Sequence, residues 1–184
     1  MGIVAALAFA LCAAPALAQK TELLVYTALE TDQIKAYEEA FKKANPNIDI
    51  KWVRDSTGVI TSKLLAEKAN PQADIVFGVS ASSLAVFDNE GMLQPYAPKG
   101  LDKISPKYRD SKNPPHWVGM DVYGAAICFN TVEAQKLGLP KPARWKDLTK
   151  PVYKGRVVMP NPASSGTGYL DVSGWIQMWG EADA

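Results

Sequence analysis

The chain has 184 residues, with 20 Lys and Arg against 19 Asp and Glu, and its formal net charge is +1. This balance gives no indication of a nucleic-acid or anionic-membrane partner. His116 is the only histidine, and Cys12 and Cys128 are the only cysteines. A His/Cys metal cluster is therefore excluded, and a Ser-His-Asp triad would have to use His116. We expect no metal and no cofactor.

The first eighteen residues are apolar or small and end in Ala16-Leu17-Ala18. This pattern predicts a secretory signal peptide, residues 1–18, cleaved after Ala18, and the run is shorter than the roughly 20 residues that span a bilayer. A buried core helix is the alternative. No basic residue precedes Cys12, which leaves open a start further upstream. Leu11 stands where a lipoprotein signal has a small residue, so we favour the soluble form from which the signal has been cleaved.

Three strand–helix pairs follow the signal. Apolar runs predict strands at 23–26, 48–52 and 73–77. Helical spacing of apolar residues, with Thr or Ser at the start and Asn-Pro or Gly at the end, predicts helices at 31–44, 56–69 and 82–90. The alternation βαβαβα predicts an α/β fold with a parallel, doubly wound sheet.

Ligands of such sheets bind beyond the carboxyl ends of the strands. Those ends are 27–30 and 78–82, so we expect four residues to line one wall of a crevice: Thr27, Leu29, Ser80 and Ser82. Glu30 and Asp121 are candidate partners for a ligand cation, although each suits a solvated or capping carboxylate equally well. Tyr123 belongs either to the core or to the crevice.

The second half of the chain has less regular patterning. Residues 95–115 predict a surface excursion, 117–130 are apolar again, and 155–159 predict a further strand. The turn Ser164-Ser165-Gly166-Thr167-Gly168 then precedes a helical run from Leu170 to Trp179. Small residues, hydroxyl groups and the unpaired amides of a helix start form a site for a tetrahedral oxyanion. An ordinary helix cap in a glycine-rich turn has the same residues.

Gly78-Val79-Ser80-Ala81-Ser82 partly matches the nucleophile elbow of serine hydrolases. The fifth position is Ser instead of Gly, and the only available base is His116. We keep a serine hydrolase that uses Ser80 as an alternative from a different functional class.

Five segments together resemble one family: 25–30, 70–83, 117–121, 127–131 and 159–168. They are similar to type II periplasmic binding proteins of the iron and phosphonate group, and most of all to the 2-aminoethylphosphonate-binding proteins of ABC importers. The resemblance covers residue 19 to the end. It implies two lobes of parallel or mixed sheet flanked by helices, which close over a ligand without catalysis.

The resemblance also implies an organisation and a partner. Residues 19–120 correspond to lobe one without its return strands, and 121–184 to the crossover and part of lobe two, so the second lobe is incomplete. Ser164, Ser165, Gly166 and Thr167 are expected to hold a small phosphonate, and the complete protein to be a monomer that delivers it to the membrane permease. Ferric-ion binding is the alternative, because Ser165, Gly166 and Thr167 match the turn that holds the synergistic anion in ferric-binding relatives. Glu30, however, replaces their iron-binding histidine.

Overall fold

The computed structural model describes residues 20–184, and the predicted signal peptide and Cys12 lie outside this range. Secondary structure begins with β1 (Thr21–Thr27), α1 (Thr31–Ala44), β2 (Ile48–Arg54), α2 (Thr57–Ala66), β3 (Ile75–Phe77) and α3 (Ala81–Asn89). The predicted order of three strands and three helices is confirmed. The strands pair in the order β2-β1-β3, and both pairings are parallel.

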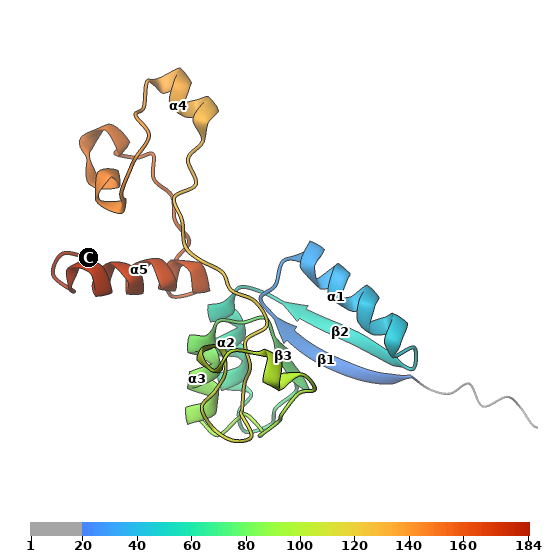
Figure 1. Cartoon of the computed structure of the whole chain (residues 1–184). Helices are drawn as coiled ribbons and strands as arrows, with labels where there is room; N and C mark the ends of the chain where they lie inside the picture. The colour runs from blue at the N-terminus through green and yellow to red at the C-terminus, as the bar shows by residue number, and fades with distance from the viewer. Residues whose placement is uncertain (1–19) are drawn as a thin grey trace, which may run out of the picture.

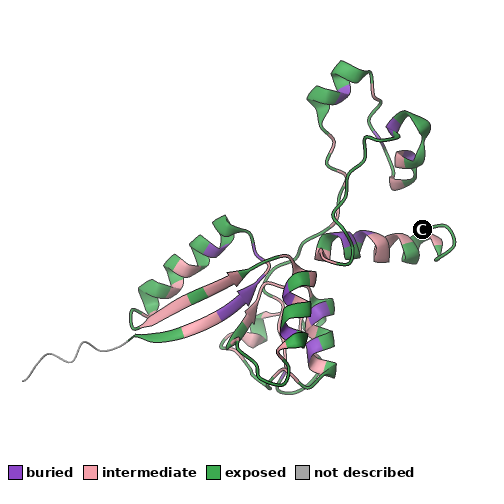
Figure 2. Cartoon of the chain, turned by 180° about the vertical axis from the view of Figure 1, so that it is seen from behind, coloured by how far each residue is buried: buried purple, intermediate pink, exposed green. Residues whose placement is uncertain are grey.

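The core lies between this sheet and the helices α2 and α3. Tyr26 from β1, Ile60 and Leu64 from α2, and Phe87 from α3 form one buried cluster. Burial of such side chains contributes about 1.5–3 kcal/mol each. The hydroxyl of Tyr26 donates to Glu67 Oε2 at 3.0 Å, so its polar end is also satisfied. Figure 2 shows buried positions in β1, α2 and α3, and further buried positions in the second half of the chain.

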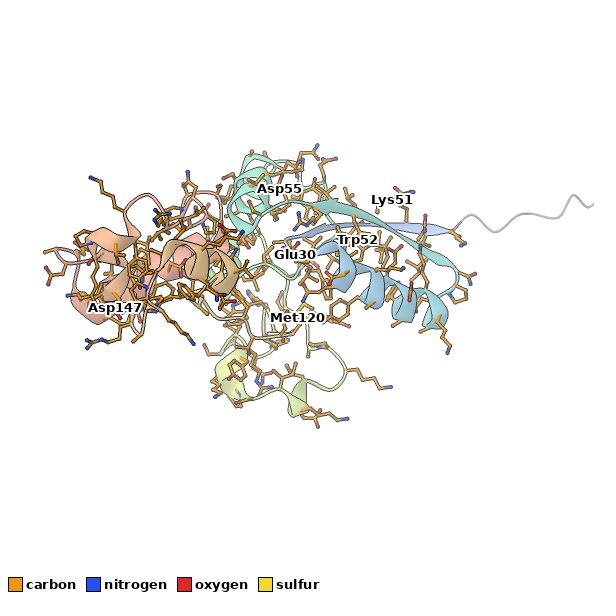
Figure 3. The ribbon with its side chains drawn as sticks, turned by 90° about the horizontal axis from the view of Figure 1, so that it is seen from above. Glu30, Lys51, Trp52, Asp55, Met120 and Asp147 are labelled. Atoms are coloured by element: carbon orange, nitrogen blue, oxygen red, sulfur yellow. The ribbon has the colours of Figure 1, made fainter. Side chains whose placement is uncertain are left out.

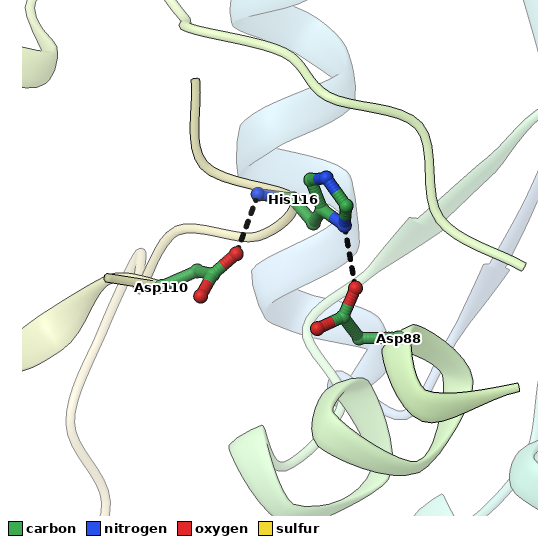
Figure 4. A group of neighbouring side chains, drawn as sticks. All are labelled: Asp88, Asp110 and His116. Carbon is green, nitrogen blue, oxygen red and sulfur yellow. Dashed lines mark hydrogen bonds and ion pairs between the residues drawn. The ribbon is translucent and has the colours of Figure 1, made fainter. Parts of the chain in front are cut away.

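Residues 90–118 form an excursion without long helices, which contains short 3-10 turns at Leu101–Lys103 and Pro106–Tyr108. Side chains attach it to α3. His116 Nδ1 lies 2.5 Å from Asp88 Oδ1, and the backbone N–H of His116 donates to Asp110 Oδ2 at 3.0 Å (Figure 4). Lys112 Nζ donates to Asp88 Oδ2 at 2.6 Å. His116 therefore has a structural role, because it links the excursion to α3.

The chain then leaves the sheet as an extended limb (Figure 1). The limb contains α4 (Thr131–Leu137), 3-10 turns at Trp145–Thr149 and Pro151–Tyr153, and α5 (Gly166–Trp179), which begins beside α2 and leads away from the sheet. The strand predicted at 155–159 is wrong, because these residues pair with no neighbouring strand in the described range and Val158 is 95% exposed. Within residues 20–184 no helix is both long and apolar enough to cross a membrane.

Candidate ligand-binding site

A cleft of about 350 Å³ opens at the carboxyl end of the sheet, where β1, β2 and β3 deliver the chain to α1, α2 and α3. The start of α5 and the crossover segment at 121–123 close it from the other side. Figure 3 labels Glu30 and Asp55 at this end of the sheet, on the side of the limb that contains Asp147. The volume lies within the range of small-molecule sites.

Four helices begin at this cleft. Their N-cap residues are Glu30 for α1, Ser56 for α2, Ser80 for α3 and Ser165 for α5, and all four line it. The first amides of a helix have no acceptor within the helix, and the helix dipole places partial positive charge there. This convergence makes one wall of the cleft favourable for an anion.

The start of α5 has backbone donors that face the cleft. The Ser165 hydroxyl accepts from the Gly168 amide at 3.3 Å, and the Ser165 carbonyl accepts from Tyr169. In the described range, the amides of Gly166 and Thr167 donate to no protein acceptor. Both residues line the cleft, so these two donors are available to a ligand.

Direct contacts hold the starts of α2 and α5 together. The Ser164 carbonyl accepts from the Ser56 hydroxyl at 2.6 Å and from the Gly58 amide at 3.1 Å. A Cβ atom added at Gly58 would lie 2.7 Å from the Ala163 carbonyl oxygen and 2.8 Å from two Ser164 backbone atoms. Only glycine at this position allows the two backbones to approach so closely.

Charged side chains line the rest of the cleft. Among the described residues that line it, Arg54 is the only cation, and it is already engaged, because it donates to Glu30 Oε2 at 2.6 Å and to the Leu29 carbonyl at 2.9 Å. Asp55 and Asp121 add two further carboxylates. The side-chain charge of the lining is therefore negative, and hydrogen-bond acceptors dominate the part of the cleft away from the α5 start.

Tyr123 lies in the same cleft, so the alternative that placed it in the core is not observed. Partial burial raises the pKa of its hydroxyl, the Asp121 charge raises it further, and the Ser80 hydroxyl acts in the opposite direction. Tyr123 is thus a neutral hydrogen-bonding group at physiological pH.

The other predicted residues divide into three placements. Leu29, Glu30, Ser80, Asp121, Ser165, Gly166 and Thr167 line the cleft as expected. Ser82 lines an adjacent cleft, and Ser164 faces α2 through its carbonyl. The expectation that Thr27 lines the crevice is corrected, because Thr27 is fully buried and its hydroxyl accepts the Leu29 amide at 3.1 Å. Thr27 supports the turn beneath the cleft.

Several lining residues were not predicted as site residues, including Gln33, Arg54, Asp55, Ser56 and Thr57. A signal for most of them was present, because 54–57 follow the second predicted strand and thus lie at the same edge of the sheet as 27–30 and 78–82. The pairing of Arg54 with Glu30 joins two segments that are distant in sequence, and no local pattern indicates it.

The hydrolase alternative requires Ser80 and His116 to meet. The Ser80 hydroxyl bonds the hydroxyls of Ser82 and Ser83, whereas the His116 ring contacts Asp88 and Lys112. The two residues therefore form no catalytic pair. Asp88, Asp110 and His116 place three potential metal-ligand atoms within 4.8 Å of one another, but the Lys112 ammonium already supplies the cation there.

Comparisons with known proteins identify relatives of this arrangement. A family model described as bacterial extracellular solute-binding protein matches residues 70–184. An uncharacterized protein of Haemophilus influenzae is 34% identical over 169 residues, which is 90% of this chain and 48% of that protein. A probable ABC transporter periplasmic-binding protein of Sinorhizobium fredii, y4fP, is 31% identical over 119 residues, or 65% of this chain and 32% of that protein.

A solved structure is similar over the same region. The periplasmic binding protein AfuA of Actinobacillus pleuropneumoniae, with exogenous fructose-6-phosphate bound, matches with a TM-score of 0.75 and 32% identity. The match covers 89% of this chain and 52% of AfuA. The chain thus spans about half the length of the Haemophilus influenzae protein and of AfuA.

Proposed function

Since the chain belongs to the bacterial extracellular solute-binding protein family, we propose that it captures a small organic phosphate or phosphonate in the periplasm and delivers it to an ABC importer. The similar y4fP is a probable ABC transporter periplasmic-binding protein and AfuA is a periplasmic binding protein, which supports the transport role. Export through the signal peptide at 1–18 and division into lobes at 19–120 and 121–184 are parts of this proposal.

The start of α5 is the observation that best supports binding of a phosphoryl group. Its two free amides, the Ser165 hydroxyl and the dipole of a 14-residue helix point to an oxyanion with several acceptor oxygens. The sequence predicted this position from the residues at 164–168 alone. A bound phosphoryl group would also lie beside the starts of α2 and α3, so three helix dipoles would share its charge.

The carboxylates of the cleft indicate the chemistry of the organic end of the ligand. Glu30, Asp55 and Asp121 accept hydrogen bonds and repel anions, and Arg54 is already paired. The organic end must therefore donate hydrogen bonds, as a polyol or an ammonium group does. This favours a sugar phosphate or 2-aminoethylphosphonate, and it disfavours a phosphorylated carboxylic acid. The 350 Å³ cleft has room for a sugar, and the similar AfuA structure contains fructose-6-phosphate.

Calorimetric titration of the protein tests this proposal. Fructose 6-phosphate, 2-aminoethylphosphonate, 3-phosphoglycerate, inorganic phosphate and ferric ion form the panel. We expect the sugar phosphate or the aminophosphonate to bind, and 3-phosphoglycerate to bind at least tenfold more weakly, because its carboxylate meets Asp55 and Asp121. Tight binding of ferric ion alone, or of none of these compounds, would contradict the proposal.

A variant pair locates the phosphoryl group. Thr167→Val removes one hydroxyl beside the free amides of α5, and Thr131→Val makes the same change in the first turn of α4, outside the cleft. A hydrogen bond to a charged oxygen contributes about 1.5–3 kcal/mol, so we expect roughly 10- to 150-fold weaker binding for Thr167→Val. The Thr131 variant should bind as the parent does.

A further inference from the structure

A second cleft of about 260 Å³ adjoins the first, between α2, α3 and the segment that leads into α5. The two clefts share four lining residues: Thr57, Ser80, Ser165 and Gly166. The position proposed for the phosphoryl group, at the start of α5, therefore lies on the boundary between them. The proposed function uses only the first cleft.

The second cleft differs from the first in charge. None of the described residues that line it is charged. Thr61 and Ser62 donate their hydroxyl protons to helix carbonyls, the Thr61 oxygen also pairs with the Ser83 hydroxyl at 2.8 Å, and the Ser62 oxygen remains as an acceptor. The hydroxyls of Ser80 and Ser82 bond one another. Val86 and Pro162 contribute apolar surface. This lining suits a neutral group that carries hydroxyls, and it offers no cation to compensate a second phosphate.

We propose that the preferred ligand is a phosphodiester, with its phosphate at the start of α5, one hydroxylated substituent in the carboxylate-lined cleft and a second small, neutral alcohol in the hydroxyl-lined cleft. This inference rests on the proposed function, because it assumes that a phosphoryl group binds at α5. A phosphomonoester has one organic substituent and would leave the second cleft without ligand atoms. A diester fills both clefts and carries one negative charge, which suits a lining with three carboxylates and one paired arginine.

The test compares sn-glycerol 3-phosphate with bis-glycerol phosphate, the diester of the same alcohol, by calorimetry. We expect the diester to bind about tenfold more tightly, which is a typical gain for filling an additional pocket. Equal or weaker binding of the diester, with clear binding of the monoester, overturns the inference and leaves the proposed function standing. Failure of both compounds, together with fructose 6-phosphate, overturns both.

Variants in the second cleft supply an independent measurement. Val86→Phe and Ser62→Gln place larger side chains in the second cleft, and neither residue lines the first. Val59→Phe is the matched control, because Val59 is 39% exposed against 41% for Val86 and lines neither cleft. Selective loss of the diester preference in the two cleft variants, but not in the control, supports the inference. An unchanged preference in both cleft variants overturns it.

Discussion

Replacement of Gly58 by alanine should weaken ligand binding without destabilising the sheet and the helices α1 to α3. The added Cβ would lie within 2.8 Å of three backbone atoms of Ala163 and Ser164, and backbone atoms cannot move aside as a flexible side chain can. The starts of α2 and α5 must therefore separate. Separation breaks the hydrogen bonds from Ser56 and Gly58 to the Ser164 carbonyl.

The magnitude follows from those two bonds. Each contributes a net of about 1 kcal/mol, so their loss should weaken binding of the ligand roughly 30-fold if the cleft needs both walls. Alanine is a better helix former than glycine by up to about 1 kcal/mol, so α2 itself should not be destabilised. The two effects have opposite signs and can be measured separately.

Calorimetry gives the affinity, and chemical denaturation followed by tyrosine and tryptophan fluorescence gives the stability. Gly174→Ala is the matched control, because Gly174 lies inside α5 and a Cβ added there meets no atom within 4 Å. Parent-like affinity in Gly58→Ala would refute the reasoning that this contact positions the two walls. Equal weakening in both variants would show that the effect does not come from the contact at Gly58.

Three further outcomes are expected. The hydrogen bond from Lys150 is the largest effect that lowers the pKa of Asp147 from 3.8 to about 2, and two backbone amides add to it. The carboxylate therefore stabilises the fold above pH 3.8, and this contribution is lost as the pH falls toward 2. Asp147→Asn should remove this acid-sensitive step from a fluorescence pH titration, and persistence of the step would contradict the assignment. His116→Gln should accelerate amide hydrogen exchange in residues 105–116, although Lys112 still pairs with Asp88. Unchanged exchange would argue against the role of His116 in linking this segment to α3. Tyr123→Phe should weaken ligand binding about three- to tenfold with an unchanged unfolding midpoint, whereas a lowered midpoint would place Tyr123 in the core instead.

The elements from β1 to α3 were predicted well because the sequence patterns that indicate them are local. Alternating or continuous apolar runs located β1 to α3, and the edge rule for parallel strands placed Ser80 and Glu30 at the cleft. Of the hydroxyl caps predicted for these helices only Ser56 agrees, because the N-cap residue is Glu30 for α1 and Ser80 for α3. The turn before α5 was predicted from its small residues and hydroxyl groups. In each case neighbouring residues determine the outcome, so the pattern was sufficient.

The errors have a different origin. Val157 and Val158 are residue types that favour strands. A strand also requires a hydrogen-bonded neighbour, and the described chain provides none for them. Thr27 ends β1 in a run of three consecutive buried residues, and its hydroxyl accepts the Leu29 amide instead of facing the cleft. Arg54 was missed because its role depends on a contact with Glu30, which only the folded arrangement of β1 and β2 creates.

The central claim is that a phosphoryl group binds at the start of α5. Proton–nitrogen correlation spectra of the ¹⁵N-labelled protein, titrated with the tightest ligand of the calorimetric panel, test it directly. New hydrogen bonds to phosphoryl oxygens should move the amide protons of Gly166 and Thr167 downfield and saturably, with the same affinity as calorimetry, while Gly174 stays in place. Saturable binding that leaves Gly166 and Thr167 unshifted would contradict the claim.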